Sequence, residues 1–248
     1  MSNLTSVVNQ YMAVWNEPDA AVRRKRIQEL WPDDGATCHS LLDARGYDAI
    51  EARVRGAHEK WVCDGGYVFR ACPNVVGHHN VTKFNWEMVP AKGGEVAAVG
   101  FDFFILTEDG RIQFDCMFNE TYTPSDELNH FVDRYVALWN EPDSTARHQL
   151  VTALWNNDGI YLNESQEQHG HRAIETVVSH TYHEYVEKGF IFRSKKNADG
   201  HHNVVRFNWD MVPANGGQVA ATGFDFFVLG EDGRIRCDYQ FNEPLPTA

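Results

Sequence analysis

The sequence has few cysteines, and these form no repeated pattern. There are five in 248 residues, an odd number that disulfides cannot fully pair. Although the two halves of the chain are alike, as described below, no cysteine has a partner at the matching position of the other half. This argues against a shared disulfide framework or a Cys-x-x-Cys metal site. We expect reduced, buried thiols in a cytoplasmic protein. The cysteines are Cys38, Cys63, Cys72, Cys116 and Cys237.

Long apolar runs and an excess of basic residues are also missing. No stretch approaches the roughly 20 apolar residues that span a bilayer, and the first residues have neither the basic start nor the apolar run of a signal peptide. The 35 acidic residues outnumber the 22 Lys and Arg, for a net charge of −13. This charge repels phosphate backbones, so we expect neither a nucleic acid nor a membrane as a partner. No phosphate loop, dinucleotide fingerprint or serine-elbow motif occurs, and no cofactor is expected.

What the sequence does have is an internal repeat. Its offset is 124 residues early in the chain and 123 after a one-residue deletion near Gly66. This period is too long for a solenoid and has the size of a domain. We therefore predict two copies of one small domain, over residues 1–122 and 128–248, joined by a short polar linker that favours packing of one half on the other. The repeated motifs are Trp15–Asp19 with Trp139–Asp143, His78–Asn80 with His201–Asn203, Phe84–Ala91 with Phe207–Ala214, and Gly100–Phe104 with Gly223–Phe227.

Each copy begins with helical periodicity and ends with strands. Apolar residues at helical spacing predict helices over residues 3–16, about 20–31 and 47–62, with Asp19 as the cap of the second. A short strand is expected over residues 36–42. The period then changes, and residues 67–71, 78–89, 96–106 and 111–120 read as strands joined by Gly-rich or Asp-Gly turns. Three helices followed by antiparallel strands define an α+β fold, with a curved sheet that encloses a conical hollow.

This layout, with a late Asp-Gly-Arg-Ile turn at residues 109–112 and again at 232–235, resembles the nuclear transport factor 2-like superfamily and within it the SnoaL-like group. The resemblance covers both halves. It implies two tandem cone-shaped domains, and, because members commonly dimerise through the sheet, a pseudo-dimer within one chain. The superfamily includes polyketide cyclases, ketosteroid isomerases, epoxide hydrolases, dehydratases and non-catalytic binding modules, so the fold does not choose a reaction.

The third predicted helix carries a candidate catalytic histidine. His58 lies four residues after Val54 and eight after Ile50, on the face directed to the hollow. An imidazole there could transfer protons near neutral pH. The alternative is a core histidine bonded to a backbone carbonyl. Tyr182 occupies the matching position in the second copy, and as a tyrosine it is a hydrogen-bond donor but a poor base.

Four aspartates on the predicted strands are candidate acids. Asp102 and Asp225 interrupt apolar runs, where burial would raise the pKa of a carboxyl group. With a two-residue Asp-Gly turn, Phe104 faces Asp115 and Asp102 faces Met117, so Asp102 and Asp115 become diagonal neighbours. Asp225 and Asp238 repeat the arrangement. A three-residue turn would place the pair on opposite faces, with Asp115 toward water.

Alternating aromatic positions predict one buried face on a strand of each copy. This face is plain core or the wall of an apolar ligand pocket. SnoaL-like cyclases place an aspartate on the last strand where this chain has Met117 and Gln240, and their histidine has no counterpart near Phe103 or Phe226, so the cyclase dyad does not carry over. The candidate substrate-binding residues are Phe84, Trp86, Met88 and Met117 in the first copy and Phe207, Trp209, Met211 and Gln240 in the second.

The remaining histidines and arginines favour structural interpretations. On extended chain His78 and His79 would point to opposite faces, and an edge or turn role is expected for them. The spacing of His180, His183 and Glu184 differs from the His-Glu-x-x-His zinc signature, so no metal site is predicted. Arg70 and Arg193 could orient a carboxylate ligand, but an ion pair with Glu87 or Asp210 on the neighbouring strand explains them more simply.

Two functions fit these patterns. The first is a cofactor-independent acid–base enzyme, of isomerase, cyclase or dehydratase type, acting on a small apolar carbonyl compound in the cone. The second is a non-catalytic binding or scaffold protein of the same fold. A division of labour, with one half catalytic and the other supporting, is motivated by the exchange of His58 for Tyr182.

Overall fold

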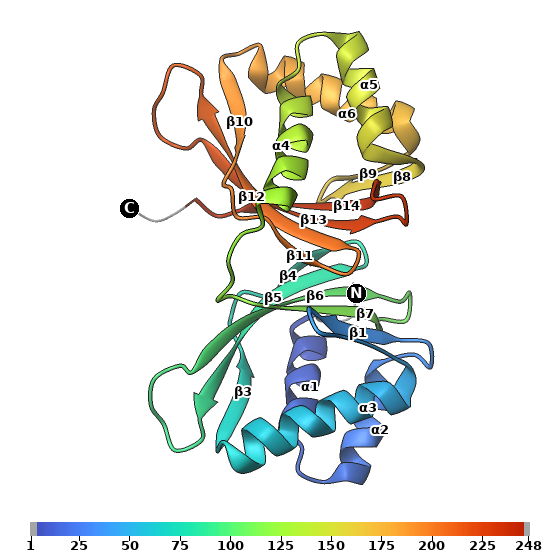
Figure 1. Ribbon diagram of the computed structural model, residues 1–248, viewed down its shortest axis with the longest axis vertical. Coiled ribbons are helices and arrows are strands. Elements are labelled where there is room, and N and C mark those ends of the chain that lie inside the picture. The colour runs from blue at the N-terminus through green and yellow to red at the C-terminus, as the bar shows by residue number, and fades with distance from the viewer. Residues whose placement is uncertain (1–3, 246–248) are drawn as a thin grey trace. The chain divides into compact units, whose positions relative to one another are not determined.

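The computed structural model describes residues 4–245, and it divides the chain into two compact units, Met1–Tyr122 (unit 1) and Thr123–Ala248 (unit 2) (Figure 1). Residue 3 of the first predicted helix and the outer ends of both predicted domains lie outside the described residues. Each unit combines helices with a curved sheet, as the α+β prediction requires. The predicted pseudo-dimer stays a prediction.

Unit 1 has its helices before most of its strands. The helices are α1 (Leu4–Asn16), α2 (Ala20–Leu30) and α3 (Gly46–Ala57), and α3 continues into a π-helical segment, η1 (His58–Asp64). The strands are β1 (Ala36–His39), β2 (Leu42–Arg45), β3 (Tyr67–Ala71), β4 (Val76–His78), β5 (Val81–Pro90), β6 (Ala98–Leu106) and β7 (Ile112–Asn119). They form one sheet in the order β2-β1-β7-β6-β5-β3, with β4 also paired to β5.

Unit 2 repeats this plan with a longer strand before its third helix. The helices are α4 (Asp126–Asn140), α5 (Ser144–Leu154) and α6 (Gly170–Thr181), followed by the π-helical η2 (Tyr182–Val186). The strands are β8 (Trp155–Asn163), β9 (Gln166–His169), β10 (Phe190–Ser194), β11 (Asp199–His201), β12 (Val204–Pro213), β13 (Ala221–Leu229) and β14 (Ile235–Glu243). The sheet order, β10-β12-β13-β14-β8-β9 with β11 on β12, repeats that of unit 1. Each sheet is mixed and not antiparallel throughout as predicted, because β1 runs parallel to β7 and β8 runs parallel to β14.

The repeated Trp-Asn-Glu-Pro-Asp motif fixes the first helix to the sheet. Asn16, at the end of α1, donates to the carbonyl oxygen of Phe69 over 2.7 Å and accepts from the Phe69 amide over 2.9 Å. The proline after it ends the helix. Asp19 then caps α2 by accepting from the Val22 amide, a contact typically worth about 1 kcal/mol. Asn140 and Asp143 repeat both contacts in unit 2.

A glycine on each central sheet lets a tryptophan lie flat across the neighbouring strand. Gly100 pairs with Trp86 across β5 and β6, and a Cβ atom at Gly100 would lie 2.1 Å from the indole. Gly223 and Trp209 repeat this arrangement, with a distance of 2.2 Å. Real Cβ atoms do not approach so closely, so a side chain here would displace the indole.

Local geometry corrects three predictions. Residues 36–45 form a hairpin, β1 and β2, instead of the one strand predicted over residues 36–42. The third helix changes to π-helical hydrogen bonding at His58 instead of continuing as an α-helix. His79 takes a positive φ of 49° between β4 and β5, so the chain turns there, and the rings of His78 and His79 approach to 3.1 Å between their Nδ1 atoms instead of pointing to opposite faces. The expected turn role beside Asn80 is confirmed.

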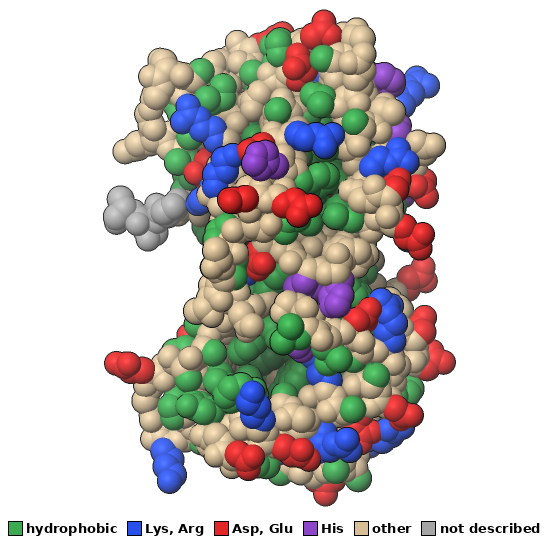
Figure 2. Space-filling model, viewed as in Figure 1, with side chains coloured by type: hydrophobic (Ala, Val, Ile, Leu, Met, Phe, Trp, Pro, Cys, Tyr) green, Lys and Arg blue, Asp and Glu red, His purple; other side chains and the backbone are tan. Residues whose placement is uncertain are grey.

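The helices pack on the inner face of each sheet and enclose an aromatic core. Tyr11 lies at the centre of this core in unit 1, with its ring centroid 4.8 Å from that of Phe104. Tyr135 and Phe227 repeat the contact at 4.8 Å in unit 2. Acidic and basic side chains are intermixed on the face of each unit that Figure 2 shows. None of the described helices combines the length and apolar character needed to cross a membrane.

Candidate functional site

A pair of aspartates lies inside the cone of each unit, in the register that the sequence predicts. Phe104 pairs with Asp115 and Asp102 with Met117, so the two carboxyl groups are diagonal neighbours on one face. The loop between the strands is longer than a two-residue turn, and an irregularity between Ile105 and Leu106 restores the pairing. Asp225 and Asp238 have the same register in unit 2. All four side chains are fully buried.

In unit 1 the pair is held by hydroxyl groups and a cation. The Tyr11 hydroxyl donates to Asp115 Oδ2 over 2.9 Å, and the Thr37 hydroxyl donates to the same atom over 2.6 Å. Arg53, which is buried, brings its guanidinium within 3.6 Å of this oxygen and also bonds Thr37. Its guanidinium carbon lies 4.8 Å from the centre of the Trp15 ring. Arg53 therefore occupies the interior of this cone and supplies a counter-charge.

Burial dominates the protonation of the unit 1 pair. It raises the pKa of Asp102 well above the ordinary value, and the neighbouring charge of Asp115 raises it further. Neither oxygen of Asp102 has a hydrogen-bond partner among residues 4–245, which favours the protonated form. Burial also raises the pKa of Asp115, against the lowering effects of Arg53, Thr37 and Tyr11. Asp102 is thus kept neutral, while Asp115 lies beside the guanidinium of Arg53.

In unit 2 no cation of the described residues acts on the corresponding pair. Tyr135 donates to Asp238 Oδ2 over 2.8 Å, as Tyr11 does in unit 1. Val177, however, stands where Arg53 would be, and Tyr161 replaces Thr37 as the strand neighbour of the second acid. Neither oxygen of Asp225 has a hydrogen-bond partner among the described residues.

The missing cation leaves the unit 2 acids in their neutral forms up to near-neutral pH. Burial raises the pKa of Asp238 to about 7, although the hydrogen bond from Tyr135 lowers it. Burial, and then the charge of Asp238, raises the pKa of Asp225 well above its ordinary value. Burial raises the pKa of Tyr161 as well, so its hydroxyl remains a donor. Asp238 is therefore a carboxylic acid that exchanges its proton in the physiological range, the property required of a general acid or base.

Unit 2 also has an open cavity above this pair. Its volume is about 280 Å³, close to the lower end of the ligand pockets of roughly 300–1,000 Å³ found in proteins. Tyr135 and Tyr161 form part of its lining, so the hydroxyl that contacts Asp238 belongs to a side chain of the cavity wall. The lining residues are Tyr135, Val136, Trp139, Tyr161, Asn163, Gln166, His180, Thr181, Glu184, Tyr185, Phe192, Trp209, Met211, Ala221, Gln240 and Asn242.

Two ionisable side chains of the cavity come from the last turn of α6 and from η2. His180 and Glu184 are four residues apart and both line the cavity, and both are exposed to solvent. Lys188 donates to Glu184 over 2.8 Å and lowers the pKa of its carboxyl group. Unit 1 has Gly56 and Lys60 at these positions. Of the two copies, unit 2 therefore has the histidine at this position.

The predicted catalytic residues outside the aspartates have structural contacts. His58 is buried and its Nδ1 lies 3.0 Å from the carbonyl oxygen of Trp15, the core contact considered as the alternative. Tyr182 is not among the cavity-lining residues and lies under the guanidinium of Arg147, 4.9 Å from its ring centre. The catalytic roles of both stay predictions that no contact described here supports.

The predicted substrate-binding residues divide between the units. Trp209, Met211 and Gln240 line the cavity of unit 2, whereas Phe207 packs behind it against Tyr135. Their unit 1 counterparts are part of the aromatic core or pack against it: Phe84, Trp86, Met88 and Met117.

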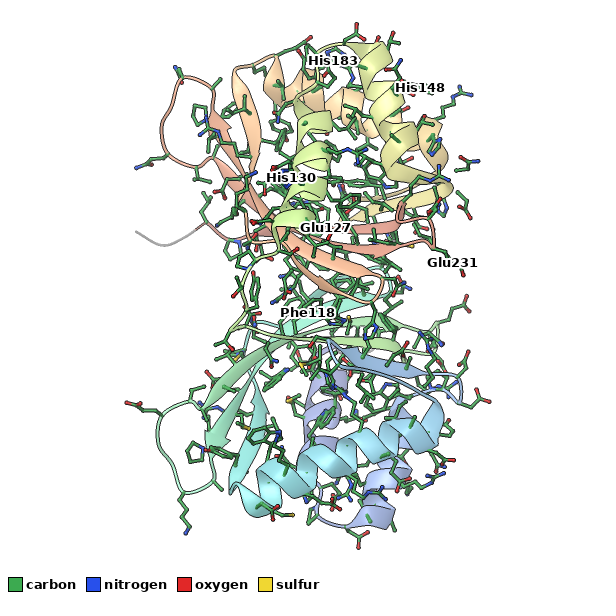
Figure 3. The ribbon with its side chains drawn as sticks, viewed as in Figure 1. Phe118, Glu127, His130, His148, His183 and Glu231 are labelled. Atoms are coloured by element: carbon green, nitrogen blue, oxygen red, sulfur yellow. The ribbon has the colours of Figure 1, made fainter. Side chains whose placement is uncertain are left out.

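The other candidates for metal or ligand binding have local partners. Arg70 pairs with Glu87 over 2.7 Å, as the simpler interpretation expects. His183 pairs with Glu187 over 3.0 Å, and Figure 3 shows it with His148 on the helical side of unit 2. Among the described residues, neither unit by itself gathers three metal-ligand side chains.

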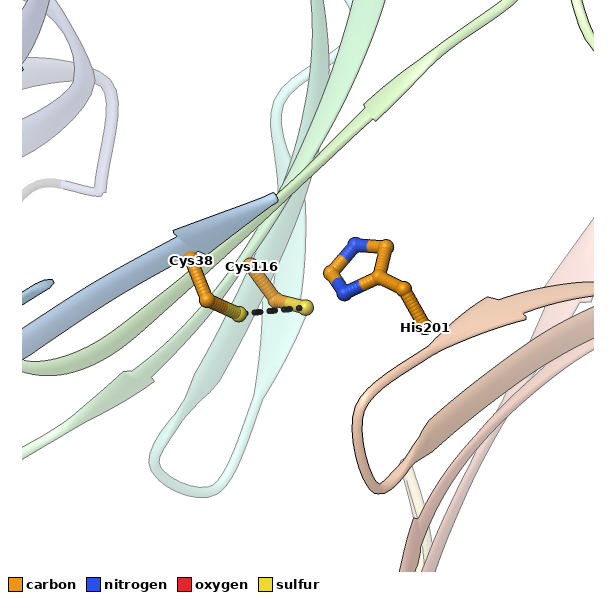
Figure 4. A group of neighbouring side chains, drawn as sticks. All are labelled: Cys38, Cys116 and His201. Carbon is orange, nitrogen blue, oxygen red and sulfur yellow. Dashed lines mark hydrogen bonds between the residues drawn. The ribbon is translucent and has the colours of Figure 1, made fainter. Parts of the chain in front are cut away.

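Two of the cysteines lie side by side on paired strands. Cys38 of β1 and Cys116 of β7 are register partners, and their Sγ atoms are 3.3 Å apart (Figure 4). Neither is disulfide-bonded. Burial and this contact raise the pKa of the Cys116 thiol well above its ordinary value, so it stays protonated and unreactive.

Several functional positions escaped the sequence-based interpretation. Tyr11 and Tyr135 read as ordinary core residues of the first helix, although a hydroxyl repeated on an apolar stripe marks a buried hydrogen bond. Arg53 lies beside the predicted helix stripe, and its replacement by Val177 was the available signal that this position faces the interior. Nothing in the sequence alone identified His180 as a cavity residue.

The fold and the site define a class: a small α+β cone that buries two acids between its helices and its sheet, one of which accepts a hydrogen bond from a tyrosine of the first helix. Residues 132–237 match the SnoaL-like domain family. Unit 2 is therefore a SnoaL-like domain, and unit 1 repeats its layout, so the predicted tandem arrangement is confirmed. No curated protein matches the chain.

Solved structures similar to this chain each cover about half of it. A proposed isomerase of the SnoaL-like family from Agrobacterium tumefaciens strain C58 is 26% identical, with a TM-score of 0.45, over 48% of this chain and 100% of its own. An NTF2-like protein of unknown function from Exiguobacterium sp. 255-15 is 23% identical, with a TM-score of 0.36, over 47% and 99%. A protein of unknown function with a cystatin-like fold from Nostoc punctiforme PCC 73102 is 15% identical, with a TM-score of 0.38, over 50% and 95%.

Proposed function

We propose that unit 2 is the active half of the chain and catalyses a cofactor-independent proton transfer on a small carbonyl compound. The observation that carries the proposal is the contact between Tyr135, whose side chain lines an open cavity, and Asp238, a buried acid with a pKa of about 7. Isomerases, cyclases and dehydratases all need such a group to donate a proton or hydrogen bond to an oxygen that gains charge.

In the proposed reaction, the carbonyl oxygen of the substrate accepts a hydrogen bond from the Tyr135 hydroxyl. Protonated Asp238 then donates to the tyrosine oxygen. Tyr135 and Asp238 together stabilise the negative charge that develops on the substrate oxygen. In the free protein the Tyr135 hydroxyl donates to Asp238 over 2.8 Å, so when the carbonyl binds, this hydroxyl proton turns to the substrate and the proton of Asp238 takes its place between the two side chains. His180 is the proposed base: it removes a proton from the carbon next to the carbonyl and returns it to the same or another carbon.

Unit 1 is proposed as a supporting copy. Its acid pair is bonded to Arg53, and the guanidinium lies against Trp15, the counterpart of the cavity residue Trp139. A cation and two hydroxyl groups already use Asp115 as their acceptor. Such a pair resembles a buried structural ion pair more than an acid available to a ligand.

Hydrogen–deuterium exchange tests the proposal without knowledge of the natural substrate. The protein is incubated in deuterium oxide with 1-tetralone, and loss of the protons next to the carbonyl is followed by NMR. We expect the wild type to accelerate exchange and Asp238→Asn to lose about 100-fold of that acceleration, because proton-transfer groups contribute about 10²–10⁴-fold. Exchange at the wild-type rate in Asp238→Asn would remove the acid from the reaction.

A non-catalytic binding protein is the second candidate. It is favoured by Met117 and Gln240, which stand where the resemblance to SnoaL-like cyclases implies an aspartate. Titration calorimetry on the same samples separates the two functions. Binding of the ketone with no acceleration of exchange by the wild type would support the binding protein and overturn the enzyme.

A further inference from the structure

The unit 2 cavity has two chemically different sides. Aromatic and apolar side chains from α4, β10 and β12 form one side, among them Trp139, Phe192 and Trp209. Four side-chain amides from β8, β9 and β14 form the other, which we call the amide wall: Asn163, Gln166, Gln240 and Asn242. An apolar compound without polar substituents could satisfy only the first side.

Hydrogen bonds hold the amide wall in place. The Asn163 amide donates to the Tyr161 hydroxyl over 3.2 Å, and that hydroxyl donates to Gln240 Oε1 over 3.3 Å. Gln240 Nε2 in turn donates to Asn242 Oδ1 over 3.3 Å. The backbone amide of Gln166 donates to Asn163 Oδ1 over 3.1 Å. These bonds fix the amides in one arrangement before a ligand arrives, and such preorganisation improves discrimination.

The lining of the cavity offers a carboxylate or phosphate ligand no lysine or arginine as a counter-charge. Its one acidic lining residue, Glu184, already has Lys188 as an ion-pair partner over 2.8 Å. The unit 2 acid pair below it has no cation comparable to Arg53 of unit 1. An anion would lose its hydration without gaining a counter-charge, which is costly.

The amide wall belongs to unit 2 alone. Strand register and the repeat place His39, Leu42 and Met117 of unit 1 at the positions of Asn163, Gln166 and Gln240. Three of the four amides are therefore absent from the copy whose interior holds Arg53. The wall accompanies the open cavity, as expected of residues that recognise a ligand.

We infer that the unit 2 cavity takes an uncharged ligand with at least two oxygen functions: a carbonyl directed to Tyr135 and a hydroxyl or second carbonyl directed to the amide wall. Side-chain amides both donate and accept, so they match a hydroxyl group. A ligand without the second oxygen would displace water from the wall without replacing the hydrogen bonds that water makes there, which is a strong basis for rejecting a close analogue. The inference rests on the proposed function for the carbonyl end and on the amide wall for the other.

Three probes with one skeleton test the inference: 1-tetralone, 6-hydroxy-1-tetralone and 1-tetralone-6-carboxylate. Their dissociation constants are measured by titration calorimetry at pH 7.5. One hydrogen bond to a preformed wall is worth roughly a factor of 10 in affinity, so we expect the hydroxyketone to bind about 10-fold more tightly than the parent ketone and the carboxylate to bind most weakly.

Variants that install the unit 1 residues provide the matched control. In the triple variant Asn163→His, Gln166→Leu and Gln240→Met, the affinity ratio of hydroxyketone to ketone should fall to about one. Gln240→Met alone, which nearly conserves volume, should reduce it even if the triple variant fails to fold, as judged by circular dichroism. Strongest binding of the carboxylate, equal binding of the two ketones by the wild type, or no binding of any probe at millimolar concentration would each overturn the inference.

The same probes distinguish this inference from the proposed function. Tyr135→Phe should abolish accelerated exchange and keep the preference for the hydroxyketone, since the amide wall is intact. A preference without exchange in the wild type would contradict only the enzyme. Exchange without a preference would contradict only the ligand class.

Discussion

Replacing Asp238 by asparagine should change how the stability of the protein depends on pH. In the wild type, the folded carboxyl keeps its proton up to a pKa of about 7, whereas the unfolded carboxyl releases it near its ordinary value of 3.8. The stability that this raised pKa contributes is complete below the ordinary value and is lost as the pH rises through 7. At 1.36 kcal/mol per pH unit, the loss between pH 5 and pH 8 is roughly 2–3 kcal/mol. Asparagine cannot ionise, and it keeps an oxygen for the Tyr135 hydroxyl.

Urea unfolding at pH 5 and pH 8, followed by tryptophan fluorescence, measures this effect. The gain in unfolding free energy from Asp238→Asn should be about 2–3 kcal/mol larger at pH 8 than at pH 5. Asp115→Asn is the matched control. At pH 8 it should lower the unfolding free energy, because it leaves the guanidinium of Arg53 without its carboxylate, 3.6 Å away. If Asp238→Asn shows the same effect at both pH values, Asp238 does not titrate near neutrality and the reasoning fails.

Three further predictions concern the cavity and its counterpart. Accelerated exchange by the wild type should decline as the pH rises above about 7, because the proposed donor loses its proton there, and a rate that climbs steadily to pH 9 would argue against it. Arg53→Met should destabilise unit 1 by about 3 kcal/mol at pH 8 and by less at pH 5, where Asp115 can take up a proton; urea unfolding with an equal loss at both values would contradict this. Gly223→Ala should displace Trp209, cost about 1–3 kcal/mol in unfolding free energy and weaken ketone binding in calorimetry. Gly100→Ala, with the same clash in unit 1, should cost similar stability without loss of binding.

Most of the fold could be predicted because the local patterns that specify its helices and strands occur in both copies. The 124-residue repeat, the caps at Asp19 and Asp143 and the alternation along β5 and β12 specify helices and strands independently in each copy. The register of Asp102 and Asp115 was one of two that the sequence left open, and it is the one observed, although the loop is longer than the two-residue turn from which it was predicted. The hairpin over residues 36–45 was missed because its two strands are only four residues long.

The candidate site was less predictable because it depends on side chains that meet only in the folded chain. Tyr11 and Asp115 are 104 residues apart, and no spacing rule links them. One difference between the units lies on the third helix: Arg53 places its guanidinium beside Trp15 and Asp115 in unit 1, and Val177 has this position in unit 2. A helical pattern identifies the face on which such a residue lies, but not how far its side chain reaches.

A paired comparison of Tyr135→Phe and Tyr11→Phe in the deuterium-exchange assay tests the account most directly. Both variants remove one hydroxyl that donates to a buried aspartate, at 2.8 Å and 2.9 Å, so their structural effects match. We expect about a 100-fold loss of accelerated exchange in Tyr135→Phe and a change within about 2-fold in Tyr11→Phe. Equal losses in the two variants, or full activity in Tyr135→Phe, would contradict the assignment of chemistry to unit 2.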